Sequence, residues 1–276
     1  MTTEDVATSE RPARTIDGLL LGAGTFTAVP VPPPRRIDAG AGAMAMLTAP
    51  VWGGLVGLIG AAAGMMVTVG AAWSGNASPL TALLAGVAAV AAGAWAARGL
   101  HLDGLADFAD ALASARRGSD ALEVMRDPRL GALGAVTLGV ALMLQAVALG
   151  SLFAAGSGAV ATLAVAVLAR APLALLVRRG TPADNSGLGR TVVGSTRPGS
   201  ATVAGALASA VALAALAGLG GMSAPAAGLA VIAAWSMAVW VRRVALRRFE
   251  VLTGDALGAA VELSATAALL ILAVVG

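Results

Sequence analysis

The sequence of 276 residues contains neither cysteine nor lysine. The absence of cysteine excludes disulfides, thiolate metal ligands and thiol nucleophiles, and it also removes the usual indication of redox compartment. The absence of lysine excludes a Schiff-base lysine, so all 18 positive charges are arginines. Guanidinium groups favour planar, bidentate contacts to phosphate or carboxylate. A functional cationic side chain in this protein is therefore expected to bind an anion in that way.

Charged residues of either sign are also scarce, at 12% of the chain. Hydrophobic residues make up 58%, and the mean hydropathy is +0.86. This apolar content exceeds what the core of a soluble domain needs, and it predicts an integral protein of the lipid bilayer. The formal net charge is only +3, and the arginines stand in short clusters between apolar runs. We therefore expect no nucleic-acid partner, although the pI is about 11.1.

Seven apolar runs are long enough to cross a hydrocarbon layer, which takes about 20 helical residues. They predict an all-α, polytopic membrane helix bundle of about seven transmembrane helices, with residues 17–276 as a single membrane-embedded catalytic domain. Residues 1–16 are polar and mixed in charge, which is typical of a disordered cytoplasmic tail. The apolar segment 18–31 is too short to cross, so we expect it in the membrane interface. The predicted spans are 48–73, 80–100, 132–154, 158–177, 200–220, 223–241 and 257–275.

The arginines predict the orientation of the chain, because arginines near span ends are retained on the cytoplasmic side. Alternate connections carry them, whereas the segments 74–79, 155–157 and 221–223 contain no charged residue. The pattern predicts a multi-pass protein with its N-terminus inside and its C-terminus outside. All long polar segments then face the cytoplasm, as expected of a membrane enzyme with a soluble substrate. The arginine-bearing segments are the tail with the first loop, and the loops 101–131, 178–199 and 242–255.

Three aspartates follow the second predicted span in the segment H-L-D-G-L-A-D-F-A-D. Asp103, Asp107 and Asp110 stand at i, i+4 and i+7, which places them within about 60° on one helix face. Nothing basic stands among them, so a shared divalent cation is the natural counter-charge. Mg²⁺, or Mn²⁺, completed by substrate phosphate suits such hard carboxylate oxygens. A solvated helix face is the alternative.

The remaining polar residues of this loop are His101 and a cluster further along. His101, the only histidine, falls on the opposite side of the helix, which favours a capping or interface residue over a metal ligand. Proton transfer or substrate binding is the alternative for it. Arg126, Asp127 and Arg129 cluster where Pro128 ends a short helix. The arginines suit phosphate, and Asp127 can orient them or add a metal ligand, with a topogenic role of the arginines as the alternative.

The two later loops add further candidates. The third loop contains G-L-G-R at 187–190, and such a turn can present backbone N–H groups to an anion. The fourth leads into L-T-G-D-A-L-G and places Asp255 at the start of the last span, as either a helix N-cap or a functional carboxylate. Glu262 lies one to two turns deeper. A carboxylate inside a span is costly and often functional.

Several motifs occur in a fixed order between the N-terminal region and the last span. They are T-F-T-A-V-P-V-P at 25–32, H-L-D-G-L-A-D at 101–107 followed by Asp110, E-V-M-R-D-P-R-L-G at 123–131, Arg170 with Pro172, G-L-G at 187–189 and T-G-D-A-L-G-A at 253–259. In this set the chain resembles the cobalamin synthase family, the adenosylcobinamide-GDP ribazoletransferases, which are membrane enzymes of vitamin B12 assembly. The resemblance implies the cytoplasmic (inner) membrane of a bacterium.

The resemblance also implies a Mg²⁺-dependent transfer. In it, a hydroxyl of α-ribazole, or of its 5′-phosphate, attacks the cobinamide-linked phosphorus of adenosylcobinamide-GDP, and GMP leaves. Such chemistry needs a metal to neutralise the diphosphate, an arginine for the leaving phosphate and a base for the hydroxyl. We expect Asp103, Asp107 and Asp110 to hold the metal, Arg126, Arg129, Arg170, Arg190 and Asp255 to bind phosphate or substrate, and Asp127 or His101 to be the base.

Other functions remain as alternatives. A CDP-alcohol phosphotransferase has a related acidic motif after a span, but here Asp107 stands where that family has arginine, and Asp110 follows too early. A transporter or channel needs polar groups at mid-depth, whereas here charged residues are almost confined to loops and Glu262 is the only acidic residue within a predicted span. A binding protein without catalysis is a third alternative. A homo-oligomer is left open.

Aromatic residues are scarce, at 3% of the chain. The sequence therefore offers no stacking platform for a large planar ligand such as a corrin ring. The spans are instead rich in alanine and glycine, and a groove between such spans is where we expect the macrocycle. Close helix contact is predicted along the first span by Gly53, Gly57, Gly60 and Gly64.

Overall fold

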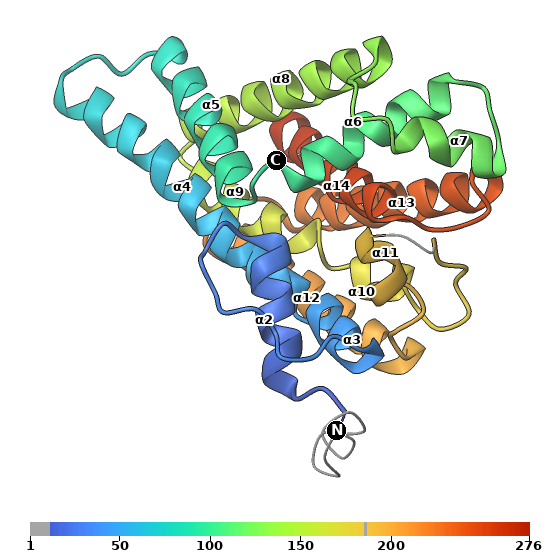
Figure 1. The fold of residues 1–276 in the computed structure, drawn as a ribbon. Coiled ribbons are helices and arrows are strands. Elements are labelled where there is room, and N and C mark those ends of the chain that lie inside the picture. The colour runs from blue at the N-terminus through green and yellow to red at the C-terminus, as the bar shows by residue number, and fades with distance from the viewer. Residues whose placement is uncertain (1–11, 185–186) are drawn as a thin grey trace, which may run out of the picture.

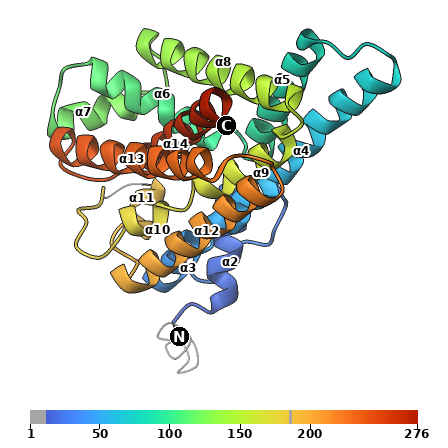
Figure 2. The same ribbon diagram turned by 180° about the vertical axis from the view of Figure 1, so that it is seen from behind.

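The computed structural model describes residues 12–184 and 187–276, and the regular secondary structure within these ranges is helical apart from two isolated bridges. The predicted all-α class is confirmed. Figures 1 and 2 show long helices crossing one another, with the short helices α2, α3, α10 and α11 gathered near the N-terminus. In chain order the helices are α2 (Thr15–Phe26), α3 (Ala39–Leu47), α4 (Ala49–Trp73), α5 (Pro79–Ala96), α6 (Leu100–Ala113), α7 (Gly118–Met125), α8 (Ala132–Ala154), α9 (Gly158–Leu168), α10 (Leu173–Leu176), α11 (Gly187–Val192), α12 (Pro198–Gly218), α13 (Ala224–Arg248) and α14 (Gly254–Val275).

Seven helical segments of the described chain are long and apolar enough to cross a membrane. They are α4, α5, α8, α9 continued through α10, α12, α13 and α14, which confirms the predicted polytopic bundle. Large apolar side chains on these helices are exposed, among them Met66, Val203 and Val274. Apolar surfaces of this extent are expected to face lipid rather than water.

The long helices approach one another through small residues. α4 packs against both α5 and α9. A Cβ atom on Gly57 would lie 2.9 Å from the Cα atom of Leu163 in α9, so the predicted close contact along this span is confirmed at that position. At the end of α13, Phe249 packs edge-on against Phe108 of α6 with ring centroids 5.6 Å apart. This aromatic pair fixes α6 against α13.

Three details differ from the predicted spans. The fourth span is interrupted between α9 and α10, because Pro172 has no N–H to continue the helix. The sixth continues to Arg248, so four arginines that we expected in a loop lie on α13. Val241 and Ala245 are fully buried at helical spacing and extend its packed face. A separate helix, α3, also precedes the first span.

The charged segments between the spans lie together. Arg248 donates from Nη2 to the carbonyl of Leu112 at 3.3 Å, which ties the end of α13 to the end of α6. Ala183 and Leu252 form an isolated parallel bridge, which ties the third predicted loop to the fourth. These contacts support the prediction that the polar segments share one face. Their assignment to the cytoplasmic side stays a prediction.

The predicted tail, residues 1–16, falls mostly on residues 1–11, which lie outside the described residues. Helix α2 begins at Thr15, so the last two residues of the predicted tail are helical. Asp17 fastens this end of α2, because its carboxylate accepts from the N–H groups of Arg14 at 2.9 Å and Arg35 at 2.8 Å. Of the apolar segment 18–31 that we expected in the interface, residues 18–26 belong to this helix, which packs on α3 and α4.

Candidate active site

A tight turn leads from α5 into the acidic segment. Arg98 and Gly99 both have left-handed backbone angles, with φ of 56° and 66°, and Gly99 is the N-cap residue of α6. A left-handed conformation is unfavourable for a side chain such as arginine. The Arg98 guanidinium donates to the carbonyl of Gly24 in α2, and this bond helps to hold the turn. α6 therefore starts directly after the span, with Asp103 in its first turn.

Helix α6 lies between α8 and α14 (Figure 1). Two glycines make the contact with α14. A Cβ atom on Gly104 would lie 2.9 Å from the Cα atom of Asp255, and one on Gly258 would lie 3.2 Å from the Cα atom of His101. The backbones approach this closely because both positions lack a side chain. The contact brings Asp255 beside the acidic face of α6.

The surroundings of Asp107 shift the pKa of its carboxyl group. Burial, followed by the charges of Asp103, Asp255 and Asp110, raises the pKa of Asp107 to about 6. Carboxylates that raise the pKa of a neighbour attract a cation to the site. Two of the predicted metal ligands, Asp103 and Asp107, are thus joined by an acid from the far end of the chain.

The sequence left two roles for Asp255, a helix N-cap or a functional carboxylate. The N-cap of α14 is Thr253, whose Oγ1 accepts from the N–H of Ala256 at 3.1 Å. Asp255 lies in the first turn of α14 instead, where it forms part of the wall of a cavity. The structure therefore leaves its carboxylate available for chemistry.

Asp110, the third predicted metal ligand, has a structural partner. Its two carboxylate oxygens accept from the backbone N–H groups of Gly131 and Gly134, each at 2.7 Å. These N–H groups belong to the first turn of α8, where no helical carbonyl can accept them. A negative charge also stabilises the positive end of a helix dipole. Asp110 thus caps α8, and both of its oxygens are engaged.

A cavity of about 240 Å³ has Asp255 in its wall. Arg126, in its wall, donates from Nη2 to both oxygens of Asp184, at 2.7 and 2.9 Å. The Arg126 side chain is 50% exposed, whereas that of Asp184 is 11% exposed. An arginine held by an ion pair at the edge of a cavity has donors left for phosphate oxygens. The polar part of the wall includes His101, Arg126, Asp184, Thr253 and Asp255.

Asp127 and Arg129, which we expected near the same site, pair with each other. Arg129 donates to the Asp127 carboxylate from Nε at 2.9 Å and from Nη2 at 2.6 Å. These bonds from Arg129 lower the pKa of Asp127 to about 2, which makes it a weak proton acceptor at neutral pH. Neither residue belongs to the cavity wall. Arg190 is exposed on α11 and also lies outside the wall.

His101 and Arg170 are brought together by α6 and the turn after α9. Both side chains are buried, and Nη2 of Arg170 lies 3.3 Å from Nδ1 of His101. A guanidinium only donates, so Nδ1 is the acceptor and the ring carries its proton on Nε2. Burial, followed by the charge of Arg170, lowers the pKa of His101 well below its usual range, which keeps the ring neutral.

The Nε2 edge of His101 is therefore a hydrogen-bond donor. The ring stacks on Phe26 with centroids 5.8 Å apart, and the buried Nε2 atom finds no partner among the described residues. Because His101 belongs to the wall of the large cavity, this donor is placed to bind an acceptor oxygen of a ligand. Arg170 lies behind the ring and outside the wall of that cavity.

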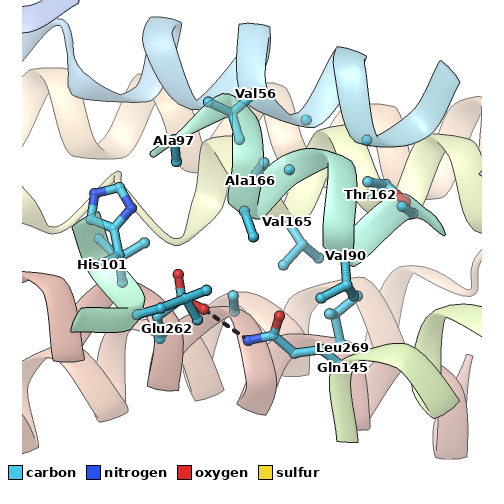
Figure 3. A pocket seen from close by; sticks show the side chains of 18 of the residues that line it. Val56, Val90, Ala97, His101, Gln145, Thr162, Val165, Ala166, Glu262 and Leu269 are labelled. Carbon is cyan, nitrogen blue, oxygen red and sulfur yellow. Dashed lines mark hydrogen bonds between the residues drawn. The ribbon is translucent and has the colours of Figure 1, made fainter. Parts of the chain in front are cut away.

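A second cavity, of about 100 Å³, lies among α4, α5, α8, α9 and α14. Figure 3 shows His101 at one end of it, with Glu262 and Gln145 along one side. Gln145 donates from Nε2 to Glu262 and to Thr266, both at 3.0 Å. Glu262 was a candidate from its place inside a predicted span, whereas Gln145 was not predicted. The lone glutamine inside an apolar span was the signal for it, because an amide at that depth needs a polar partner.

The α6 acids and Asp255 meet only part of the requirements of a metal site. In the part of the chain that the structure describes, no group of three or more histidine, cysteine, aspartate or glutamate side chains is arranged to hold one. Mg²⁺ does not need such a cage, because it is usually held by one or two carboxylates with water and substrate phosphates. Asp103 and Asp107 can supply two carboxylates of that kind, and the nearby charge of Asp255 favours a cation between them.

Comparison with known proteins adds a family. The family model described as Cobalamin-5-phosphate synthase matches residues 18–273. Similar proteins include three named adenosylcobinamide-GDP ribazoletransferase. The protein of Frankia casuarinae is 40% identical over 187 residues, which cover 64% of this chain and 66% of the relative. For the Klebsiella pneumoniae protein the identity is 38% over 168 residues, or 60% of this chain and 65% of the relative.

The third of these relatives, from Roseiflexus sp., is 37% identical over 175 residues, which cover 62% of this chain and 60% of the relative. In each case the match spans slightly less than two thirds of the relative's own length. No solved structure matches the chain.

Proposed function

This chain belongs to the cobalamin-5-phosphate synthase family, and on that premise we propose that it transfers the adenosylcobinamide-phosphate group of adenosylcobinamide-GDP to α-ribazole or its 5′-phosphate. The acceptor hydroxyl bonds to the cobinamide-linked phosphorus, the bond from that phosphorus to the GMP oxygen breaks, and GMP leaves. The product is adenosylcobalamin or its 5′-phosphate. One observation carries the proposal: Asp255 and Arg126 line one cavity, and the charge of Asp255 acts on Asp107 of the neighbouring acidic helix α6.

Mg²⁺, with Mn²⁺ as a substitute, is the cation that suits this site. Asp103 and Asp107 would hold it, and when bound it neutralises the charge of the diphosphate. Asp110 was expected as a third ligand. We propose instead that Asp110 fixes the position of α6, because both of its oxygens accept from the first turn of α8.

The side chains of the cavity wall perform the other tasks. Arg126, oriented by Asp184, binds the phosphate that leaves with GMP. His101 donates from Nε2 to an oxygen of the substrate. Asp255 accepts the proton of the attacking hydroxyl, since it is the acid of this group that forms part of the cavity wall. This role passes to Asp255 because Arg129 lowers the pKa of Asp127 to about 2, which makes Asp127 a weak proton acceptor, and because Asp127 lies outside the cavity wall.

The cellular location follows from the same proposal. Seven apolar helices make the chain a multi-pass membrane protein. We place it in the cytoplasmic (inner) membrane of a bacterium, with the cavity on the cytoplasmic side where nucleotide substrates are found. The alternation of arginines between the predicted spans supports this orientation.

Direct assay of the reaction tests the proposal. Purified protein in lipid nanodiscs, given adenosylcobinamide-GDP, Mg²⁺ and either α-ribazole or its 5′-phosphate, should release GMP and form the matching corrinoid product, both measured by chromatography. Asp107→Asn should abolish turnover and leave protein abundance intact. Asp120→Asn is the matched control, because Asp120 is exposed on α7 outside the cavity wall.

Two results would contradict the proposal at different points. No corrinoid product from the wild-type protein with either acceptor would refute the reaction. Near-normal GMP release by Asp107→Asn would leave the reaction standing and refute the role of the α6 acids.

A further inference from the structure

Two opposite charges face the second cavity without touching. Arg170 and Glu262 both belong to its wall, and their charges interact. They do not form an ion pair, whereas Arg126 and Asp184 do. Separated charges among apolar helices cost free energy unless polar groups compensate them. A polar group is therefore expected between the guanidinium and the carboxylate.

The unused hydrogen-bonding capacity around the cavity defines that group. Arg170 donates from Nη1 to the carbonyl of Ala166 at 2.9 Å and from Nη2 to His101. Its buried Nε has no partner among the described residues. On the other side, Gln145 gives its amide hydrogens to Glu262 Oε2 and to Thr266. Figure 3 shows an oxygen of Glu262 and one of Gln145 turned toward the space between the helices.

The unused groups of the cavity wall include one guanidinium donor, Arg170 Nε–H, and two acceptors, Glu262 Oε1 and Gln145 Oε1; the Nε2–H of His101 is assigned to the larger cavity. A primary carboxamide has the complementary set, with two N–H bonds and one carbonyl oxygen. We propose that this cavity binds a carboxamide side chain of the corrinoid substrate, an inference that rests on the proposed function. The corrin ring of a cobinamide carries several such side chains. The –NH₂ group donates to Glu262 and Gln145, and the carbonyl accepts from Arg170.

The size of the cavity agrees with one side chain and excludes the ring. A volume of about 100 Å³ admits a propionamide or acetamide arm, whereas the macrocycle must stay outside. A cavity of this size also admits water molecules. Water is therefore the alternative occupant, and the experiment below separates the two.

The two cavities are placed so that one substrate reaches both. His101 and Val261 belong to the walls of both cavities. Glu262 follows Asp255 by seven residues on α14, which is about 10 Å along the helix axis. A substrate with its diphosphate beside Asp255 and Arg126 can therefore lay its corrin ring near His101 and extend one arm to Glu262. The arm would fix the orientation of the ring relative to the phosphorus.

The test exchanges the charge on each side of the proposed contact. Binding of adenosylcobinamide, which lacks the nucleotide, and of its separated monocarboxylic acid isomers is measured to nanodisc-embedded protein by equilibrium dialysis and corrinoid absorbance. Wild-type protein should bind one acid isomer about tenfold or more weakly than the amide, because its carboxylate meets Glu262. Glu262→Gln should reverse this preference for that isomer, because glutamine supplies an N–H donor.

Two further variants, both on α8, test the role of Gln145 and provide a control. Gln145→Met removes an acceptor and should weaken adenosylcobinamide binding without reversing the preference. Ser151→Ala is the matched control on α8, because Ser151 donates to the carbonyl of Ala148 in its own helix and lies outside both cavity walls. It should bind every corrinoid as the wild type does.

The outcomes separate this inference from the proposed reaction. If Glu262→Gln leaves the preference for every acid isomer unchanged, or adenosylcobinamide does not bind, the cavity holds water only and the inference is overturned. If turnover is normal and the reversal is absent, the carboxamide site is refuted and the proposed reaction is not. If the reversal is observed and no product forms, the carboxamide site is supported and the proposed reaction is refuted.

Discussion

Asp110 and Gly134 are joined by a hydrogen bond of 2.7 Å from the backbone N–H of Gly134 to Oδ1 of Asp110. The bond fastens the acidic helix α6 to the start of α8, and the N–H of Gly131 makes a second one of the same length to Oδ2. Asp110, which the sequence places on the same helix face as Asp103 and Asp107, therefore holds that face in position against α8. Its own charge is neutralised by the end of a helix.

We expect Gly134→Ala to break this connection. The added Cβ atom would clash with the Asp110 carboxylate and lie 2.8 Å from the carbonyl oxygen of Ala106. Overpacking of this kind typically costs about 1–3 kcal/mol. The control is Gly139→Ala on the same helix, where a Cβ atom meets nothing within 4 Å and alanine is the better helix former. The two variants are compared by heating detergent-solubilised protein and measuring the monodisperse fraction by gel filtration. Equal midpoint temperatures would contradict the stabilising role of the contact between Asp110 and Gly134.

The spans of this protein could be predicted because their signal is local. Hydropathy and length alone identify the helices, and the predicted 132–154 coincides with α8. The interruption at Pro172 was not predicted, although the proline is visible, because the apolar run continues through it to 176. The extension of α13 to Arg248 was missed for the opposite reason. Arginines end an apolar run but do not end a helix, since arginine is a good helix former.

The site was predictable only where its residues share one helix. The spacing of Asp103 and Asp107 places them together without any knowledge of the fold. The role of Asp110 depends on two glycines of another helix, and that of Asp255 depends on the glycine contact between α6 and α14. Tertiary contacts of this kind leave no periodic pattern in the sequence. The pairing of Asp127 with Arg129 follows from their proximity in the chain, whereas the pairing of Arg126 with Asp184, 58 residues away, followed only from the structure.

The raised pKa of Asp107 predicts a pH-dependent effect of divalent cations on stability. Its pKa is about 6 in the folded protein and 3.8 in the ordinary group. A raised pKa in the folded state favours folding fully below pH 3.8, and this contribution is lost as the pH rises through 6. Protein without a divalent cation should therefore lose stability between pH 5 and pH 7.5 through this group. Mg²⁺ should restore more stability at pH 7.5, where Asp107 is ionised and protons no longer compete.

Thermal unfolding midpoints measured at both pH values, with Mg²⁺ or with EDTA, test this expectation. Asp107→Asn should remove most of the difference between the two pH values, and Asp120→Asn should keep it. Stabilisation by Mg²⁺ that is as large at pH 5 as at pH 7.5 would show that Asp107 does not take part in binding the cation.

The contact between Arg170 and His101 predicts a single tautomer of the imidazole. His101 is the only histidine of the chain, so protein labelled with [¹⁵N]histidine and purified through a tag without histidine gives the signals of one ring. We expect a neutral ring at pH 7 with the proton on Nε2, because Arg170 donates to Nδ1 at 3.3 Å. Arg170→Met should allow the other tautomer, and Arg170→Lys should largely preserve the first. A ring protonated on Nδ1 in the wild-type protein would rule out the donor role of His101.

Two arginines of one short segment are expected to differ in their effect on substrate binding. Arg126 belongs to the cavity wall and is oriented by Asp184, so Arg126→Ala should raise KM for adenosylcobinamide-GDP about tenfold or more. Arg129 is 87% exposed and pairs with Asp127. Exposed pairs contribute little, so Arg129→Ala should change KM by less than about twofold.

Steady-state kinetics with both substrates distinguish this expectation from a general effect of lost positive charge. KM for α-ribazole should stay near the wild-type value in both variants, because the phosphate that Arg126 binds belongs to the nucleotide substrate. Asp184→Asn should raise KM for adenosylcobinamide-GDP in the same direction as Arg126→Ala but to a smaller extent, since the guanidinium is kept and only its orientation is relaxed. Equal increases in Arg126→Ala and Arg129→Ala would mean that phosphate is bound outside the cavity, by the charge of the whole segment.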